Sequence, residues 1–191
     1  MRHHAAVEVK EVAAFMKSLR AQGGVGARAL EFAVLTAARS GEVRGVTWAE
    51  IDLKAALWTI PATRMKSGRE HRVPLSKPAI KLLRALPGDR LPQDHVFPGM
   101  RGPLSDMSLT AVLRRMDVSA TAHGFRSTFR DWVSEYTEHS GEVAEMALSH
   151  AIGDKVEAAY RRGDLLEKRV ALMTDWASFL SSWRRATSNG A

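Results

Sequence analysis

Apolar positions recur at helical spacing over most of the chain. Residues 9–19 place four apolar side chains on one face of a helix: Val12, Phe15, Met16 and Leu19. Residues 27–38 are apolar almost all round, which predicts a helix buried on every side. The same reasoning predicts a short helical piece between the turn at 40–41 and residue 48, and helices over 76–86, 105–116, 124–136, 140–148, 154–161 and 166–185.

Two short runs, 57–61 and 71–75, have a β-like pattern instead. The polar stretch between them contains Gly68 and is typical of a hairpin. Ser76 resembles a helix N-cap with Pro78 in the first turn of the following helix, whereas residues 87–103, rich in Pro and Gly, indicate a loop. We therefore predict a mainly α fold with a small antiparallel β-sheet.

The length of 191 residues suits one well-buried domain. We expect this domain to cover residues 1–185 and a flexible tail to follow over 186–191. No apolar run approaches the roughly 20 residues that span a bilayer, and the N-terminus lacks the apolar core of a secretory signal. The absence of cysteine excludes disulfides and thiolate chemistry and fits a cytoplasmic protein.

The chain is strongly basic, with 28 Lys and Arg residues against 21 Asp and Glu residues and a net charge of +7. This balance is typical of proteins that bind polyanions, with nucleic acid the first candidate and an acidic membrane surface the second. An ordinary soluble protein with solvated basic faces has the same composition. Charge therefore narrows the class of partner and does not assign one.

Candidate functional residues lie in four short segments, in this order: Arg39 with Glu42, Lys66, His123 with Arg126, and His150 followed ten residues later by Tyr160. Each has a simpler interpretation when taken alone, as a surface ion pair, a solvated turn residue, a capping histidine or a packing tyrosine. The ordered set is much harder to explain in that way, so we interpret these residues as one active site.

This ordered set resembles the catalytic signature of the tyrosine recombinases, and the segments 65–75 and 123–132 are similar to phage-type integrases of prophages and genomic islands. The resemblance covers most of the chain and implies the catalytic-domain fold of these DNA breaking-rejoining enzymes. It implies that Glu42 orients Arg39 and that six residues are catalytic: Arg39, Lys66, His123, Arg126, His150 and Tyr160.

Two local departures from the family pattern stand beside these residues. Many members have Thr-Gly before the first arginine, where this chain has Thr36-Ala37, and many have Leu-Gly-His, where it has Leu148-Ser149-His150. Both changes suggest altered packing beside the active site and replace no catalytic group. The family also has an N-terminal core-binding domain, which we expect to be absent from this chain.

The chemistry implied by the resemblance is transesterification through a 3′-phosphotyrosyl intermediate. Arg39 and Arg126 would bind the phosphate oxygens as guanidinium forks, with His150 as a third donor, and Lys66 would protonate the leaving oxygen. His123 would take or return the proton of the phenol. Tyr136 is interpreted as structural, because no histidine precedes it at a matching spacing.

We expect neither a metal nor another cofactor. Two-metal nucleases need clustered carboxylates, and the acidic residues near the motifs form no such pattern: Asp131, Glu135, Glu142 and Glu145.

The implied partners are double-stranded DNA attachment sites and other integrase protomers, not a membrane. Basic residues expected to contact phosphates are Arg64, Arg69, Arg72, Arg130 and Arg161, with Arg114, Arg115, Lys155 and Arg162 as weaker candidates. The last predicted helix carries an apolar face with Trp176, Phe179, Leu180 and Trp183. This face packs either on a neighbouring subunit, as the resemblance implies, or on its own domain.

Three other functions stay open at this point. A type IB topoisomerase-like enzyme would relax DNA with the same catalytic residues, and a catalytically idle DNA-binding module would keep the fold alone. A hydrolytic phosphoesterase using His123 and Arg126 would leave no covalent protein–DNA adduct.

Overall fold

The computed structural model of the chain describes residues 5–150 and 163–182. Its helices are α1 (Val9–Arg20), α2 (Val25–Thr36), α3 (Ser40–Arg44), α4 (Lys77–Ala85), α5 (Ser108–Arg115), α6 (Gly124–Tyr136), α7 (Gly141–Ala147) and α9 (Leu166–Phe179). There are also two 3₁₀ turns in the described ranges: η1 (Trp48–Glu50) follows α3, and η2 (Ala62–Arg64) lies between two strands. The predicted helices inside the described ranges are confirmed, most of them within three residues at each end. The predicted helix over 154–161 lies outside the described residues.

The sheet confirms the predicted hairpin and adds a strand. Strands β2 (Leu57–Ile60) and β3 (His71–Pro74) pair antiparallel, with Leu57 opposite Pro74 and Ile60 opposite His71. A third strand, β1 (Ile51–Asp52), pairs with β2 on the other side. It was not predicted, since two residues are too few to show an alternating pattern. The predicted loop over 87–103 likewise contains a minimal pair, β4 (Pro98–Gly99) with β5 (Gly102–Pro103).

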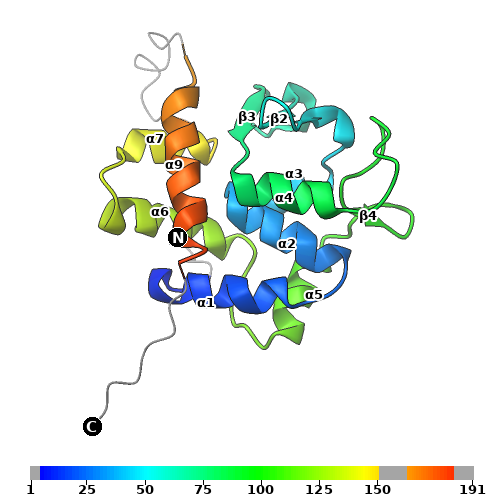
Figure 1. The fold of residues 1–191 in the computed structure, drawn as a ribbon, viewed down its shortest axis with the longest axis horizontal. Coiled ribbons are helices and arrows are strands. Elements are labelled where there is room, and N and C mark those ends of the chain that lie inside the picture. Colours follow the sequence, from blue (N-terminus) through cyan, green and yellow to red (C-terminus); the bar gives the residue numbers. More distant parts are fainter. Residues whose placement is uncertain (1–4, 151–162, 183–191) are drawn as a thin grey trace.

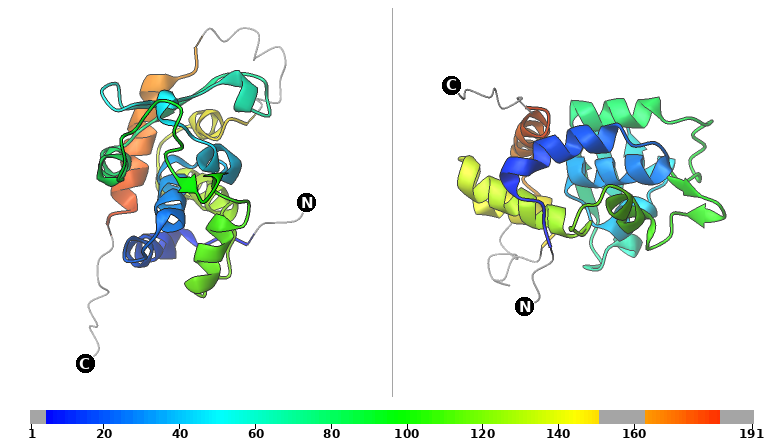
Figure 2. Two further views of the ribbon diagram at one scale, coloured as in Figure 1. Left: turned by 90° about the vertical axis from the view of Figure 1, so that its right-hand side faces the viewer. Right: turned by 90° about the horizontal axis from the view of Figure 1, so that it is seen from below.

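The elements form two groups that share one core. Helices α6, α7 and α9 lie together on one side of the molecule, and α2, α3, α4 and the sheet lie on the other (Figure 1). Helix α1 contacts both α2 and α6, and seen from below it spans the two groups (Figure 2). Helix α2 is buried along most of its length, as its apolar sequence predicted.

Helix α9 packs on its own domain. Of the two alternatives for its apolar face, a neighbouring subunit or its own domain, the described residues therefore follow the second. Trp176 is fully buried and its indole Nε1 donates to the carbonyl oxygen of Val34 at 2.8 Å. Leu180 is also fully buried, and Phe179 contacts Trp132 with ring centroids 5.7 Å apart. Trp183 lies outside the described residues.

The prediction that this last helix extends to residue 185 is wrong, since α9 ends at Phe179. The hydroxyl groups of Ser181 and Ser182 donate to the carbonyl oxygens of Ala177 and Phe179, at 2.9 and 2.7 Å. Two hydroxyl groups inside α9 make the same kind of bond, so such bonds do not by themselves end the helix.

None of the described helices combines the length and the apolar character that a membrane span requires.

Candidate active site

Arg39 lies between α2 and α3, where it is the N-cap residue of α3. Its backbone N–H donates to Glu42 Oε2 and its Nη1 donates to Glu42 Oε1, each at 2.8 Å. Glu42 is only 8% exposed, so its carboxylate holds the guanidinium from inside the protein. This is the contact that an orienting role of Glu42 toward Arg39 requires.

Arg126 lies in the first turn of α6 and is 4% exposed. Its Nη1 donates to the carbonyl oxygen of Ala37 and its Nη2 to that of Leu148, each at 2.6 Å. Burial and the nearby charge of Arg39 lower the pKa of Arg126 to about 10, which leaves the guanidinium protonated at neutral pH. Arg126 therefore fixes a positive charge where the end of α2 meets the end of α7.

His150 is held between Arg126 and Glu145. Its Nε2 lies 3.1 Å from Arg126 Nη2, and its Nδ1 lies 2.6 Å from Glu145 Oε2. Because a guanidinium only donates hydrogen bonds, Nε2 accepts, and Nδ1 carries the proton that is donated to Glu145. This arrangement fixes both the tautomer and the orientation of the ring.

Glu145 is a site residue that the sequence did not reveal. It accepts a hydrogen bond from Arg130 Nε at 2.6 Å in addition to the one from His150. Burial acts to raise the pKa of Glu145, but the hydrogen bonds from Arg130 and His150 outweigh it and hold the pKa below its ordinary value. The ionised carboxylate therefore holds His150 by a hydrogen bond, as the Glu42 carboxylate holds Arg39. Its position five residues before His150 follows no recognisable motif.

The two arginines converge on one turn of the chain. Arg39 Nη2 donates to the carbonyl oxygen of Ser149 at 3.2 Å, next to the Leu148 carbonyl that Arg126 binds. Adjacent Cα atoms are only about 3.8 Å apart, so both guanidiniums lie close to the same peptide bond. Two guanidiniums at this spacing suit the binding of a phosphate group. With Nε2 accepting and Nδ1 donating, His150 has no free N–H, so it supports Arg126 and is not the third phosphate donor that was predicted.

Two left-handed residues shape the backbone around this cluster. Ala37 has φ = 51° and Ser149 has φ = 49°. This conformation costs an L-residue roughly 1–2 kcal/mol, and glycine avoids that cost. These are the two positions where many members of the family that the sequence resembles have glycine. The two departures therefore also concern backbone conformation, which the sequence did not indicate.

Of the other three predicted catalytic residues, two are exposed and one lies outside the described residues. His123 is the exposed N-cap residue of α6, and Lys66 is exposed in the connection between β2 and β3. The structure gives the Lys66 amino group no contact with Arg39 or Arg126. Tyr160 lies outside the described residues. The structure thus brings together Arg39, Glu42, Arg126 and His150. Apart from the phosphate contact of His150, the roles of the predicted site residues stay predictions.

Three of the arginines predicted to contact DNA bind carboxylates of their own domain: Arg64 pairs with Glu50, Arg72 with Asp164, and Arg130 with Glu145. Arg64 also donates through Nη2 to the carbonyl oxygen of Glu42 at 2.6 Å, so it supports the loop that carries Arg39. Arg69 is exposed, and Arg161 lies outside the described residues. Their DNA contacts stay predictions.

His71, the first residue of β3, is a second group that sequence reasoning missed. It lies beside Arg39 and Glu42 of the α3 region and Arg169 of α9, and the backbone of Ala147 in α7 hydrogen-bonds to it. Burial, reinforced by the charge of Arg169, lowers the pKa of His71 to about 4. The imidazole is therefore neutral where a proton would add a third positive charge beside two arginines.

The low pKa of His71 predicts a pH-dependent stability. An unfolded chain has a histidine pKa of about 6.5, so as the pH falls the unfolded state binds this proton first and stability is lost between about pH 6.5 and pH 4. We expect the free energy of unfolding to fall by about 2 kcal/mol from this residue between pH 7 and pH 5. Urea unfolding at the two pH values measures the loss. His71→Asn, which cannot titrate, should lose about 2 kcal/mol less than the unsubstituted chain; an equal loss in both proteins would contradict the assignment.

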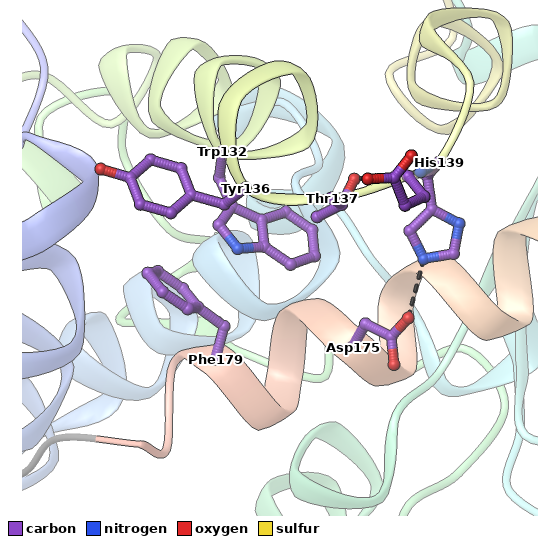
Figure 3. A pocket seen from close by; sticks show the side chains of 7 residues that line it. Trp132, Tyr136, Thr137, His139, Asp175 and Phe179 are labelled. Carbon is purple, nitrogen blue, oxygen red and sulfur yellow. Dashed lines mark hydrogen bonds and ion pairs between the residues drawn. The ribbon is translucent and has the colours of Figure 1, made fainter.

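A groove of about 550 Å³ between α6 and α9 lies apart from this cluster (Figure 3). Its lining includes Trp132, Phe179 and the pair of His139 Nε2 with Asp175 Oδ2 at 2.7 Å, and no Lys or Arg. Tyr136 also lines it, at the end of α6 ten residues after Arg126. Ten residues of helix extend about 15 Å. Tyr136 therefore stands too far along the helix to attack a phosphate held by Arg126.

Within residues 5–150 and 163–182, no three His, Asp or Glu side chains come together in a way that could hold a metal ion.

Comparison with known proteins shows which family the chain belongs to. A model of the phage integrase family matches residues 5–164. Prophage integrase IntZ of Escherichia coli (strain K12) is 35% identical to this chain over 189 residues, covering 94% of the chain. The integrase of Enterobacteria phage P4 is 32% identical over 201 residues and also covers 94% of the chain. The chain spans about half the length of these relatives, 46% of each.

A solved structure has the same fold. The integrase from mycobacterium phage Brujita superposes with a TM-score of 0.69 over 98% of this chain and 61% of that one. At 18% sequence identity, this likeness concerns the fold.

Proposed function

Since the chain belongs to the phage integrase family of tyrosine recombinases, we propose that it cuts and rejoins double-stranded DNA in site-specific recombination, with Tyr160 as the nucleophile. The observation that carries the proposal is the convergence of Arg39, Arg126 and His150 on the turn at 148–149. The proposed partners of the protein are DNA attachment sites and other integrase protomers, and its proposed place of action is the cytoplasm.

The two arginines supply the charge that the reaction needs. A phosphodiester resists attack because its non-bridging oxygens are negative, and that charge persists in the transition state. Arg126 is held by two backbone carbonyls and Arg39 by Glu42, so both guanidiniums are oriented before DNA binds. Preorganised donors of this kind need little rearrangement at the moment of reaction.

The nucleophile and the acid complete the step. The phenol oxygen of Tyr160 bonds to phosphorus, the bond from phosphorus to the 5′ oxygen breaks, and Lys66 gives that oxygen a proton. A phenol with a pKa of about 10 is mostly protonated at neutral pH, so His123 receives its proton and the nearby guanidiniums stabilise the phenolate. The energy of the broken bond is kept in the 3′-phosphotyrosyl link, and reversal of the step joins a new 5′-hydroxyl end.

A duplex nicked close to the cleavage position tests the proposal, because the short 5′-hydroxyl fragment diffuses away and traps the adduct. A library of such duplexes with a randomised central region removes the need to know the target sequence. We expect a covalent protein–DNA species in denaturing gels, formed equally well with and without EDTA. Cleaved DNA without an adduct would support a hydrolytic phosphoesterase, and loss of cleavage in EDTA would support a metal-dependent nuclease.

A further inference from the structure

Three charged residues outside the arginine cluster form a closed set of hydrogen bonds. Arg72 of β3 donates through Nε and Nη2 to the two carboxylate oxygens of Asp164, at 2.9 and 2.7 Å. Arg169 of α9 donates through Nη2 to Asp164 Oδ2 at 2.6 Å and through Nε to the Asp164 carbonyl oxygen at 2.7 Å. Arg169 Nη1 donates to the carbonyl oxygen of Arg72. Asp164 is therefore held through its side chain and its backbone.

The charges of these three residues stabilise the hydrogen bonds among them. Arg169 is 1% exposed, and a buried guanidinium is stable only when its charge is paired. Burial acts to raise the pKa of Asp164, but hydrogen bonds from Arg72 and the charge of Arg169 hold it below its ordinary value. The carboxylate stays ionised at neutral pH, so its hydrogen bonds with Arg72 and Arg169 are present under physiological conditions.

Asp164 follows Tyr160 by four residues, which makes its position decisive for the nucleophile. Four residues extend at most about 14 Å, whereas the ten residues from His150 to Tyr160 extend up to about 36 Å. His150 and Asp164 are both held in place, one on each side of Tyr160. Asp164 therefore limits the position of Tyr160 much more closely than His150 does.

Asp164 is also close to the active site. It binds Arg72, whose neighbour in β3 is His71. His71 hydrogen-bonds to the backbone of Ala147, and the next residue along the chain provides a carbonyl oxygen that Arg126 binds.

We propose that Asp164, Arg72 and Arg169 are positioning residues that set the reach of Tyr160 to the phosphate, a role that rests on the proposed function. In this role they act on Tyr160 through the chain and do not touch the reacting atoms. Fixing Asp164 against β3 limits how far Tyr160 can lie from β3 and the adjoining active site, which favours the approach of its oxygen to phosphorus. Misplacement by about 1 Å can slow an enzyme about 10²-fold.

Asp164→Asn tests this role, since it removes the charge and keeps the shape of the side chain. We expect the adduct to form about 10- to 100-fold more slowly on the nicked duplexes, with DNA affinity unchanged. Arg72→Lys keeps a positive charge beside Asp164 but cannot make both hydrogen bonds to its carboxylate. This variant should therefore also form the adduct more slowly. Glu167→Gln, which changes an exposed carboxylate in the first turn of α9, is the matched control and should react at the unsubstituted rate.

A nucleophile from solution separates positioning of the tyrosine from support of the arginine site. In Tyr160→Phe, hydroperoxide can attack phosphorus instead; its oxygen bonds to phosphorus while the 5′ oxygen leaves and takes a proton. We expect Asp164→Asn to leave this peroxide-dependent cleavage unchanged in the Tyr160→Phe background. An equal slowing of peroxide cleavage, or an unchanged rate of tyrosine adduct formation, would overturn the positioning role. Absence of any adduct from the unsubstituted chain would instead overturn the proposed function on which it rests.

Discussion

Arg126→Lys slows formation of the covalent protein–DNA adduct by about 10²- to 10³-fold, the usual cost of losing one preorganised donor to a transition-state oxyanion. A single ammonium cannot serve both carbonyl groups, those of Ala37 and Leu148, and also face a phosphate. The substitution keeps the charge, so the loss reports the geometry of the guanidinium. Single-turnover cleavage of the nicked duplex measures it.

Arg84→Lys on α4 is the control for this substitution, because Arg84 is exposed. It should leave the cleavage rate unchanged. Thermal unfolding of both variants shows whether the fold persists at the temperature of the assay, since one unpaired buried carbonyl costs about 1–3 kcal/mol. Cleavage by Arg126→Lys within about threefold of the unsubstituted rate would remove Arg126 from phosphate binding, because a lost oxyanion donor costs far more than that.

Lys66→Ala slows cleavage of ordinary DNA by about 10²- to 10⁴-fold, as expected for loss of a general acid. The defect should largely disappear on DNA in which sulfur replaces the bridging 5′ oxygen, because a thiolate leaves without needing a proton. Comparison of single-turnover rates on the two substrates measures the rescue.

Arg39→Ala provides the contrast for the Lys66 experiment. Its guanidinium acts on the non-bridging oxygens, whose charge the sulfur substitution leaves in place, so this variant should stay slow on both substrates. Equal rescue of Arg39→Ala would contradict the division of roles. Rescue of His123→Ala in place of Lys66→Ala would make His123 the acid.

The fold was predictable where a pattern extends over many residues. The helical periodicity of 9–19 and 124–136 identified α1 and α6, and the polar break around Gly68 identified the β2–β3 hairpin. Strand β1 was missed because two residues carry no period. The end of α9 was missed because apolar residues continue at helical spacing beyond its last residue, at Leu180 and Trp183, and this spacing does not mark where a helix ends.

The active site was predictable only where a family motif marks it. Arg39, Glu42, Arg126 and His150 were expected together, and the structure brings them together. Glu145 was considered only as a metal ligand, although its contact with His150 arises from the turn at the end of α7. Such residues act through pairings that the fold creates.

Arg72 is a residue whose binding partner could not be predicted from the sequence. Its charge suggested a DNA contact, which stays a prediction, whereas nothing in the sequence indicated that Asp164, 92 residues further along the chain, binds it. A separation of that length leaves no trace in local sequence patterns. The charge of an arginine is visible in the sequence, and its partner is visible only once the fold brings distant segments together.

The most direct test of the account is to identify the amino acid that carries the DNA. Trypsin separates the two tyrosines of this chain, since Tyr160 falls in the peptide 156–161 and Tyr136 in the peptide 131–155. Nuclease trimming of the trapped adduct followed by trypsin and mass spectrometry should find a 3′-linked nucleotide on peptide 156–161, and none after Tyr160→Phe. A nucleotide on peptide 131–155, or an adduct that persists in Tyr160→Phe, would contradict the assignment of Tyr160 as the nucleophile.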